Sequence, residues 1–209
     1  MSGAVRLLCA HHSRIRDGIE RRLRSFRRAG RLGLRGLFAE FAFCLLTPQS
    51  SARVCWRAVN DLRRMNLLFS APPARLAAAL RTVRFRHTKA RRIVENRTRW
   101  TVVLRRIRTT PDDAQLRDWL AENVRGMGMK EASHFLRNIG RGSSLAILDR
   151  HILRRLTELG VIAAVPRTLT PARYREIEAL MRSFASNNGL PMDHLDLLLW
   201  HKSTGDLFK

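Results

Sequence analysis

Residues 126–138 read GMGMKEASHFLRN, a glycine-rich turn followed at once by a helical pattern. The preceding stretch, AQLRDWLAENV (114–124), has apolar residues at helical spacing and follows the start signal TTPDD. Two helices joined by Gly126-Met127-Gly128 would form a helix–hairpin–helix unit. Glycine permits positive φ and lets backbone amides approach a ligand closely. The amides that open the second helix lie at the positive end of its dipole, so the pattern predicts a phosphate site, with a plain helical corner as the alternative.

Lys130 follows this hairpin, in a chain whose basic residues are almost all arginine. Of the 40 Lys and Arg residues four are lysines, which leaves 40 − 4 = 36 arginines. Arginine stays protonated, whereas lysine can lose its proton and act as a nucleophile. The dipole at a helix N-terminus disfavours the ammonium form of Lys130 and favours the neutral amine. The alternative is that Lys130 only pairs with a phosphate. In this chain that role predicts arginine, so the presence of lysine favours a catalytic role.

A second candidate lies 149 − 130 = 19 residues downstream, in SSLAILDRHILRRL. Asp149 is the only acid between Glu131 and Glu158, and it stands where a helix is expected to begin. An ordinary N-cap is the alternative role. The two roles are compatible, because a carboxylate held by helix amides is rigid. Beside Lys130, Asp149 could assist proton transfer or stabilise a cationic sugar transition state.

Composition narrows the class of protein. The 209 residues are 45% hydrophobic, which is enough to form a core and argues against disorder. Subtracting 17 acidic from 40 basic residues gives a net charge of +23. Such a field attracts polyanions, and nucleic acid is the first candidate, with a genome-wide arginine bias as the alternative. No apolar run is long enough to span a bilayer, so we expect an intracellular protein.

Cys9, Cys44 and Cys55 are scattered and contain no CxxC pair. They fit a reducing compartment and small buried side chains better than a disulfide framework. They also exclude a four-cysteine iron–sulfur or zinc site built from this chain alone.

Periodicity predicts helices throughout. The Arg-rich start could pass for a transit peptide, but Ile15, Ile19, Leu23 and Phe26 fall at helical spacing and favour an amphipathic helix. WTVVLRRI (100–107) is ambiguous between strand and helix. The remaining predicted helices cover residues 34–46, 52–62, 74–81, 87–100, 114–124, 130–139, 146–159, 170–188 and 192–205. We therefore expect an all-α fold: one domain over 1–209 with two helical lobes, a hairpin motif at about 113–140, and the active site in the cleft between the lobes.

Smaller signals favour plain roles. His11 and His12 lie near the terminus and are predicted to be solvated. The runs RRLRSFRR and KARR (89–92) are predicted to be solvated faces first and phosphate contacts second. Four potential metal ligands lie close together near the C-terminus: Asp193, His194, Asp196 and His201. These residues also suit helix capping and surface pairing, so we expect no catalytic metal there.

With these residues in view, the sequence resembles the helix–hairpin–helix DNA glycosylases, whose mark is a GxGxK hairpin followed by a helix-starting Asp. Within that superfamily it is similar to the type-2 8-oxoguanine DNA glycosylase/AP lyases of archaea and some bacteria. Arg125 stands where the family hairpin often carries proline or another neutral residue, and the missing cysteines separate the chain from the endonuclease III branch. The blocks that carry the resemblance are FCLLTPQSSA (43–52), VRFRHTKARRIVENR (83–97), GMGMKEASHFLRNIG (126–140), LAILDRHILRRL (145–156) and LDLLLWHKSTGDLFK (195–209).

The resemblance implies a role for each matching residue. Lys130 matches the Schiff-base lysine and Asp149 the catalytic aspartate. Phe85 and Trp200 match aromatic residues that line the pocket for the extruded base, although either could be a core aromatic. Lys209 matches a C-terminal lysine that takes part in lesion recognition.

The resemblance also implies an activity. It is that of a bifunctional base excision repair enzyme, which excises 8-oxoguanine from duplex DNA through a lysine Schiff base and nicks the abasic strand by β-elimination. Gly126, Gly128 and Met129 would contact the DNA backbone. We expect double-stranded DNA containing 8-oxoguanine or abasic sites as the partner, no cofactor, a monomer, and a cytoplasmic, nucleoid-associated location. The alternatives are a non-catalytic helix–hairpin–helix DNA-binding protein and, more distantly, a basic RNA-associated protein.

Overall fold

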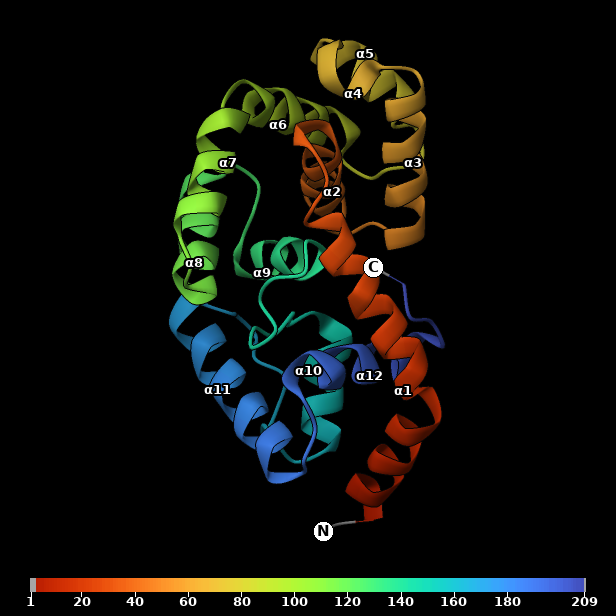
Figure 1. Ribbon diagram of the computed structural model, residues 1–209, viewed down its shortest axis with the longest axis vertical. Helices are drawn as coiled ribbons and strands as arrows, with labels where there is room; N and C mark the ends of the chain where they lie inside the picture. The colour runs from red at the N-terminus through yellow and green to blue at the C-terminus, as the bar shows by residue number, and fades with distance from the viewer. Residues whose placement is uncertain (1–2, 209) are drawn as a thin grey trace. The chain divides into compact units, whose positions relative to one another are not determined.

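The computed structural model describes residues 3–208, and every regular element in that range is an α-helix (Figure 1). The predicted all-α fold is confirmed. None of these helices is both long and apolar enough to cross a membrane. The helices are α1 (Gly3–Ala29), α2 (Leu34–Leu46), α3 (Ala52–Arg64), α4 (Leu67–Ser70), α5 (Pro73–Ala79), α6 (Arg86–Thr98), α7 (Trp100–Thr109), α8 (Asp113–Asn123), α9 (Met129–Asn138), α10 (Arg150–Glu158), α11 (Pro171–Asn187) and α12 (Met192–Thr204).

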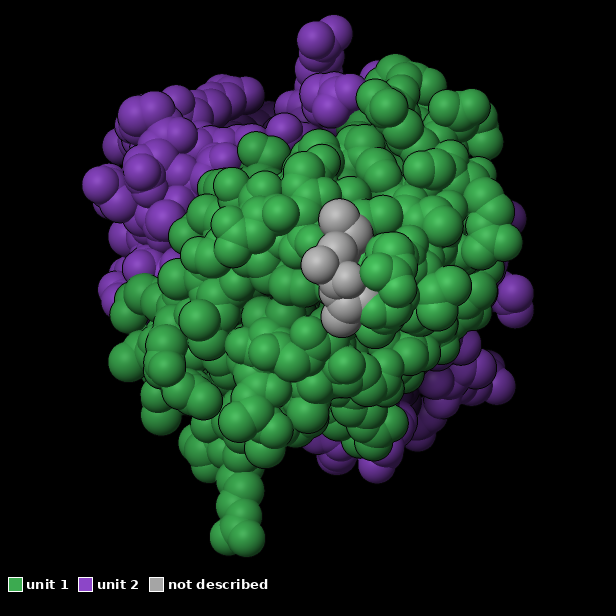
Figure 2. Space-filling view, turned by 90° about the horizontal axis from the view of Figure 1, so that it is seen from below, with its two compact units in different colours: residues 1–25, 142–207 green, residues 26–141, 208–209 purple. Residues whose placement is uncertain are grey.

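The chain divides into two compact units, coloured separately in Figure 2. Unit 1 comprises residues 1–25 and 142–207, and unit 2 comprises residues 26–141 and 208–209. Helix α1 contributes to both. The apolar stripe predicted for this helix is present, because Ile19 and Phe26 are buried and Ile15 is half-buried.

The core of unit 2 forms around α2, whose residues from 37 to 46 are all buried. Helix α2 packs against α3, α6 and α9 (Figure 1). An apolar sequence on every side of a helix suits a position enclosed by other helices. Phe41 stacks edge-on against Phe135 of α9, with ring centroids 5.4 Å apart, and lies 5.0 Å from the ring of Trp100. Burying each of these aromatic side chains stabilises the unit by roughly 2–3 kcal/mol.

A buried lysine closes the C-terminal end of α2. Lys89 Nζ donates to the carbonyl oxygens of Leu46 and Pro48, both at 2.7 Å, and to Ser50 Oγ at 3.1 Å. The Lys89 side chain satisfies carbonyls that have no partner within the helix. The prediction that KARR (89–92) is solvated is wrong at its first residue, because Lys89 is 2% exposed.

Unit 1 packs α10 and α11 against α12, and two histidine pairs connect α1 to α12. His11 Nε2 lies 3.0 Å from His201 Nδ1, and His12 Nε2 lies 3.0 Å from His194 Nδ1. The prediction that His11 and His12 are solvated is therefore wrong. Sequence reasoning missed the pairs because their members are more than 180 residues apart.

Two local predictions are resolved by tertiary contacts. The ambiguous stretch 100–107 lies in α7, with Val103 and Ile107 on its buried face. The predicted helix over 146–159 begins too early, because α10 starts at Arg150 and residues 145–148 are buried and belong to no helix.

Candidate active site

The hairpin forms where the sequence predicts it, between α8 and α9, which pack against each other. Gly126 has φ +91°, and a Cβ atom at this position would collide with the side chain of Arg92. Met127 points inward and is 3% exposed. The side-chain amide of Asn96 donates to the carbonyl of Arg125 at 3.1 Å, which fixes the entrance to the turn. Asn96 was not identified from the sequence, because nothing in its surroundings indicates that it reaches a turn 29 residues away.

Glu131 organises the start of α9. Its Oε2 accepts a hydrogen bond from the amide of Gly128 at 3.2 Å, and its Oε1 lies 2.9 Å from Lys130 Nζ. This is half of a capping box, since glycine has no side chain to complete it. The side chains of Lys130 and Glu131 are 26% and 14% exposed. Lys130 is thus both accessible and held in place, and a phosphate that takes the Gly128 amide must displace Glu131.

Lys130 belongs to a positively charged region of unit 2. Burial lowers the pKa of Lys89; the nearby Cys55 opposes this effect, and the charges of Arg92, Lys130 and Arg84 add to it. Burial raises the pKa of the Cys55 thiol to about 11, so Cys55 stays neutral at physiological pH. Glu131 is the carboxylate that pairs with Lys130 in this region.

Asp149 occupies the N-cap of α10, as predicted. It is half-buried, and its Oδ1 accepts a hydrogen bond from the amide of Ile152 at 2.8 Å. The cap fixes the orientation of the carboxylate relative to the helix.

The non-helical segment before Asp149 is held by buried side chains of α11 and α12. Glu178 Oε2 accepts from the amide of Ala146 at 2.7 Å, and Asp196 Oδ1 accepts from the amide of Ile147 at 3.3 Å. The hydroxyl of Tyr174 accepts from the amide of Leu148 at 3.2 Å and donates to the carbonyl of Ala146 at 2.7 Å. Buried backbone groups need such partners when no helix or sheet supplies them. The prediction of surface pairing for Asp196 is wrong, because this side chain is 2% exposed and accepts its hydrogen bond from the buried amide of Ile147.

The aromatic candidates differ in their surroundings. Trp200, in unit 1, is half-buried, and its ring meets that of His151 edge-on with centroids 5.4 Å apart. Its indole N–H is buried and has no hydrogen-bond partner among the described residues. Phe85, in unit 2, is 57% exposed, has φ +57°, and lies beneath the guanidinium of Arg84 at 5.4 Å. Lys209 lies outside the described residues.

The predicted site residues are distributed over both units. Lys130, Phe85 and the hairpin residues Gly126, Gly128 and Met129 belong to unit 2, whereas Asp149 and Trp200 belong to unit 1. Gly128 is exposed, and Met129 is half-buried. Across residues 3–208, no group of three or more His, Cys, Asp or Glu side chains is arranged to hold a metal ion.

A glycine hairpin between two helices, followed by an accessible lysine and then by a helix-capping aspartate, is the arrangement of the helix–hairpin–helix class of DNA-acting proteins. Residues 19–190 match the model of the Ogg-HhH family, described as 8-oxoguanine DNA glycosylase. The chain belongs to this family, and the predicted resemblance is confirmed.

Individual relatives agree with the family match over almost the whole chain. An 8-oxoguanine DNA glycosylase/AP lyase of Fusobacterium nucleatum is 42% identical over 194 residues, which cover 90% of this chain and 89% of that protein. The crystal structure of the Thermotoga maritima 8-oxoguanine DNA glycosylase matches with a TM-score of 0.89 and 34% identity, covering 98% of each chain. The Methanocaldococcus jannaschii 8-oxoguanine glycosylase/lyase, solved with a 15mer DNA containing 8-oxoguanine, matches with a TM-score of 0.91 and 30% identity, covering 98% of this chain and 99% of that one.

Proposed function

We propose that this chain is a bifunctional 8-oxoguanine DNA glycosylase/AP lyase that acts on duplex DNA in base excision repair. The observation that carries the proposal is Lys130, an accessible amine at the first turn of α9 directly after the hairpin, in a family whose relatives have this activity by name. A purely DNA-binding role leaves this lysine, in an otherwise arginine-based chain, without an explanation. We also place the enzyme in the cytoplasm, on the nucleoid.

The chemistry starts with a neutral Lys130. Its ammonium must first release a proton, and Glu131 Oε1, 2.9 Å from Nζ, is an acceptor within reach. The amine then bonds to C1′ of the damaged nucleotide as the glycosidic bond breaks and the base departs with its electron pair and takes up a proton. Asp149 stabilises the positive charge that develops on the sugar. The C1′–O4′ bond then breaks, O4′ takes up a proton, and the nitrogen forms an imine with C1′. Removal of a proton from C2′ expels the 3′ phosphate by β-elimination, which cuts the strand on the 3′ side of the lesion.

Recognition combines phosphate contacts with extrusion of the base. Gly126, Gly128 and Met129 contact the DNA backbone, and the Gly128 amide exchanges Glu131 for a phosphate oxygen. Phe85 and Trp200 are the aromatic residues that we assign to contacts with the extruded base.

Lys209 discriminates the lesion. 8-Oxoguanine carries an N7–H donor that guanine lacks, so an acceptor supplied by Lys209 distinguishes the two bases.

The test is release of 8-oxoguanine and strand cleavage on matched duplexes that contain 8-oxoguanine or guanine. Wild-type protein should release the oxidised base and nick the strand, whereas Lys130→Gln should do neither while still binding DNA. Asp149→Asn should slow the reaction by about 10²–10³-fold, because it removes charge stabilisation of the transition state. Undiminished DNA binding by a wild-type protein that neither releases the base nor nicks the strand would instead support the non-catalytic alternative.

A further inference from the structure

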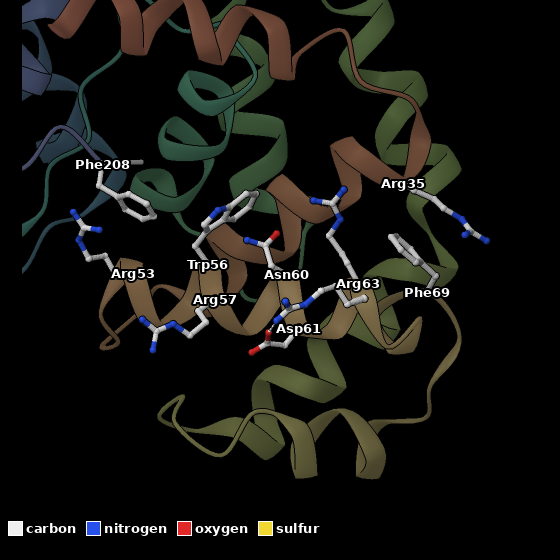
Figure 3. Close-up of a pocket in the computed structure, with 10 residues that line it drawn as sticks. Arg35, Arg53, Trp56, Arg57, Asn60, Asp61, Arg63, Phe69 and Phe208 are labelled. Carbon is white, nitrogen blue, oxygen red and sulfur yellow. Dashed lines mark hydrogen bonds and ion pairs between the residues drawn. The ribbon is translucent and has the colours of Figure 1, made fainter.

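Unit 2 contains a concave surface, which runs along α3 and forms an open pocket of about 760 Å³ (Figure 3). Seven residues of α3 line it at helical positions i, i+3, i+4, i+7, i+8, i+10 and i+11, so they share one face of the helix. We call this surface the α3 groove; its helical face consists of Arg53, Trp56, Arg57, Asn60, Asp61, Arg63 and Arg64. The opposite face of α3 is buried in the core, which explains why the helix is amphipathic. Packing does not explain why its exposed face is so strongly basic.

The charge of the groove is suited to a polyanion. Arg35 joins the four α3 arginines in the lining, and Asp61 is its one carboxylate, which pairs with Arg64. Five arginines and one aspartate leave a net charge of 5 − 1 = +4 in a single groove. Concave surfaces with one sign of charge concentrate the potential and attract the opposite charge.

The aromatic residues of the groove add a second kind of contact. The guanidinium of Arg53 lies 5.0 Å from the ring centroid of Phe208, and that of Arg35 lies 4.9 Å from the ring of Phe69. Figure 3 shows these two arginine–aromatic pairs at opposite ends of the groove, with Trp56 between them. Aromatic faces and guanidinium groups along a positive groove are the recurring means of binding single strands, because bases stack on the rings while arginines bind phosphates.

We propose that the α3 groove binds an unpaired DNA strand, with Arg57 and Arg63 on phosphates and a base stacked on Trp56. A regular duplex fits this lining poorly. Its bases stack on one another, so their faces are not accessible to the aromatic side chains of the groove. Asn60 adds an amide that can donate to or accept from the edge of a base.

The groove does not include Lys130, but α3, which lines the groove, also carries a residue near Lys130. Cys55, the residue before Trp56, lies close enough to Lys130 for the lysine charge to oppose the rise in its pKa. Cys55 belongs to the buried face of α3, so a strand held in the groove would lie on the other face of that helix. The source of that strand rests on the proposed function, since β-elimination produces a nicked strand whose end can leave the duplex; the binding itself does not depend on it.

The test is fluorescence anisotropy of a labelled oligothymidylate titrated with full-length protein that carries Lys130→Gln, so that binding is measured without chemistry. Adding Arg57→Gln and Arg63→Gln should weaken binding roughly tenfold and reduce the dependence of log Kd on log salt by about 1.4, the value for two phosphate contacts to a single strand. The matched control is Arg105→Gln with Arg108→Gln, two exposed arginines of α7 in the same unit, which should leave affinity close to that of the parent.

Trp56→Phe keeps an aromatic ring in place and should abolish most of the quenching of tryptophan fluorescence that the oligonucleotide causes. Equal losses in the groove and control variants would overturn the proposal, because binding would then reflect overall charge. Tighter binding of oligouridylate than of oligothymidylate would assign the groove to RNA and overturn it as well. Activity on the 8-oxoguanine duplex is measured separately, so failure of the proposed function leaves the oligothymidylate result unaffected.

Discussion

At the scale of single residues, Lys89 and Lys130 show that the few lysines of this chain can have different roles, one structural and one proposed to be catalytic. Both stand in a chain with 36 arginines, and both belong to unit 2. Lys89 is a lysine because a compact ammonium can donate to three acceptors in a site where it is 2% exposed. Lys130 has one carboxylate partner and remains 26% exposed. Accessibility, and not rarity alone, separates the candidate nucleophile from the structural lysine.

Replacing Lys89 with methionine should therefore destabilise the protein by roughly 2–5 kcal/mol, because the carbonyls of Leu46 and Pro48 would be buried without their donor. Urea unfolding followed by circular dichroism measures the loss. Lys202→Met, at an exposed position, is the control and should change the free energy of unfolding little. Equal effects of the two changes would show that the hydrogen bonds of Lys89 do not stabilise α2.

The sequence predicts the principal site residues better than their partners. Lys130 and Asp149 were placed correctly at the starts of helices, because hairpin glycines and N-cap residues are local signals. Asn96 and Glu178 were missed, because their roles depend on backbone groups about 30 residues away. The sequence shows that Glu131 can accept hydrogen bonds. That it contacts Gly128 and Lys130 at the same time became clear only from the conformation of the turn.

At the scale of elements, helical periodicity predicted almost every helix, and it failed where tertiary contacts replace helical hydrogen bonds. Residues 146–148 are apolar and precede a true helix, so the pattern extended the prediction backwards. In the folded unit their amides bind Glu178, Asp196 and Tyr174 instead. Such partners from distant helices are invisible to a local pattern. These partners hold the segment that leads to Asp149, the N-cap of α10.

Tyr174→Phe should slow excision more than it weakens DNA binding. The change removes the hydroxyl that bonds Leu148 and Ala146, which loosens the segment leading to Asp149 and costs about 1–3 kcal/mol of stability. Single-turnover excision and affinity for an undamaged duplex are measured side by side at a temperature where the variant is folded. A rate equal to that of wild type would contradict a positioning role for Tyr174.

The histidine pairs between α1 and α12 predict that acid weakens unit 1. Burial lowers the pKa of His11 below its ordinary 6.5, as do the charges of His201, Arg14 and Lys202. Burial likewise lowers the pKa of His12; His194 and Arg16 act in the same direction, and Glu20 opposes them.

Because the unfolded chain binds these protons more readily, the stabilisation is complete above pH 6.5 and is lost as the pH falls from 6.5 through the folded-state pKa values. Thermal unfolding between pH 7.5 and 5 measures the effect. A double variant, His11→Gln with His12→Gln, should show a smaller fall in Tm over this range. An unchanged pH dependence would show that other groups are responsible.

At the scale of the whole molecule, net charge and family membership point to the same partner. A charge of +23 alone is compatible with an arginine bias that would affect any protein from the same source. The match of residues 19–190 to the 8-oxoguanine DNA glycosylase family gives that charge a role, since phosphate contacts supply much of the affinity for DNA. Under the proposed function, specificity comes from the few residues that reach the base and the sugar, and we assign Lys130 to that group.

Borohydride trapping tests this central claim most directly. Sodium borohydride reduces a lysine imine on C1′ to a stable amine and so links the protein covalently to the strand. We predict that wild-type protein incubated with an 8-oxoguanine duplex forms this adduct and that Lys130→Arg, which keeps the charge but cannot form the imine, does not. An adduct that persists in Lys130→Arg, or base release by the wild-type protein with no adduct at all, would contradict the assignment of Lys130 as the nucleophile.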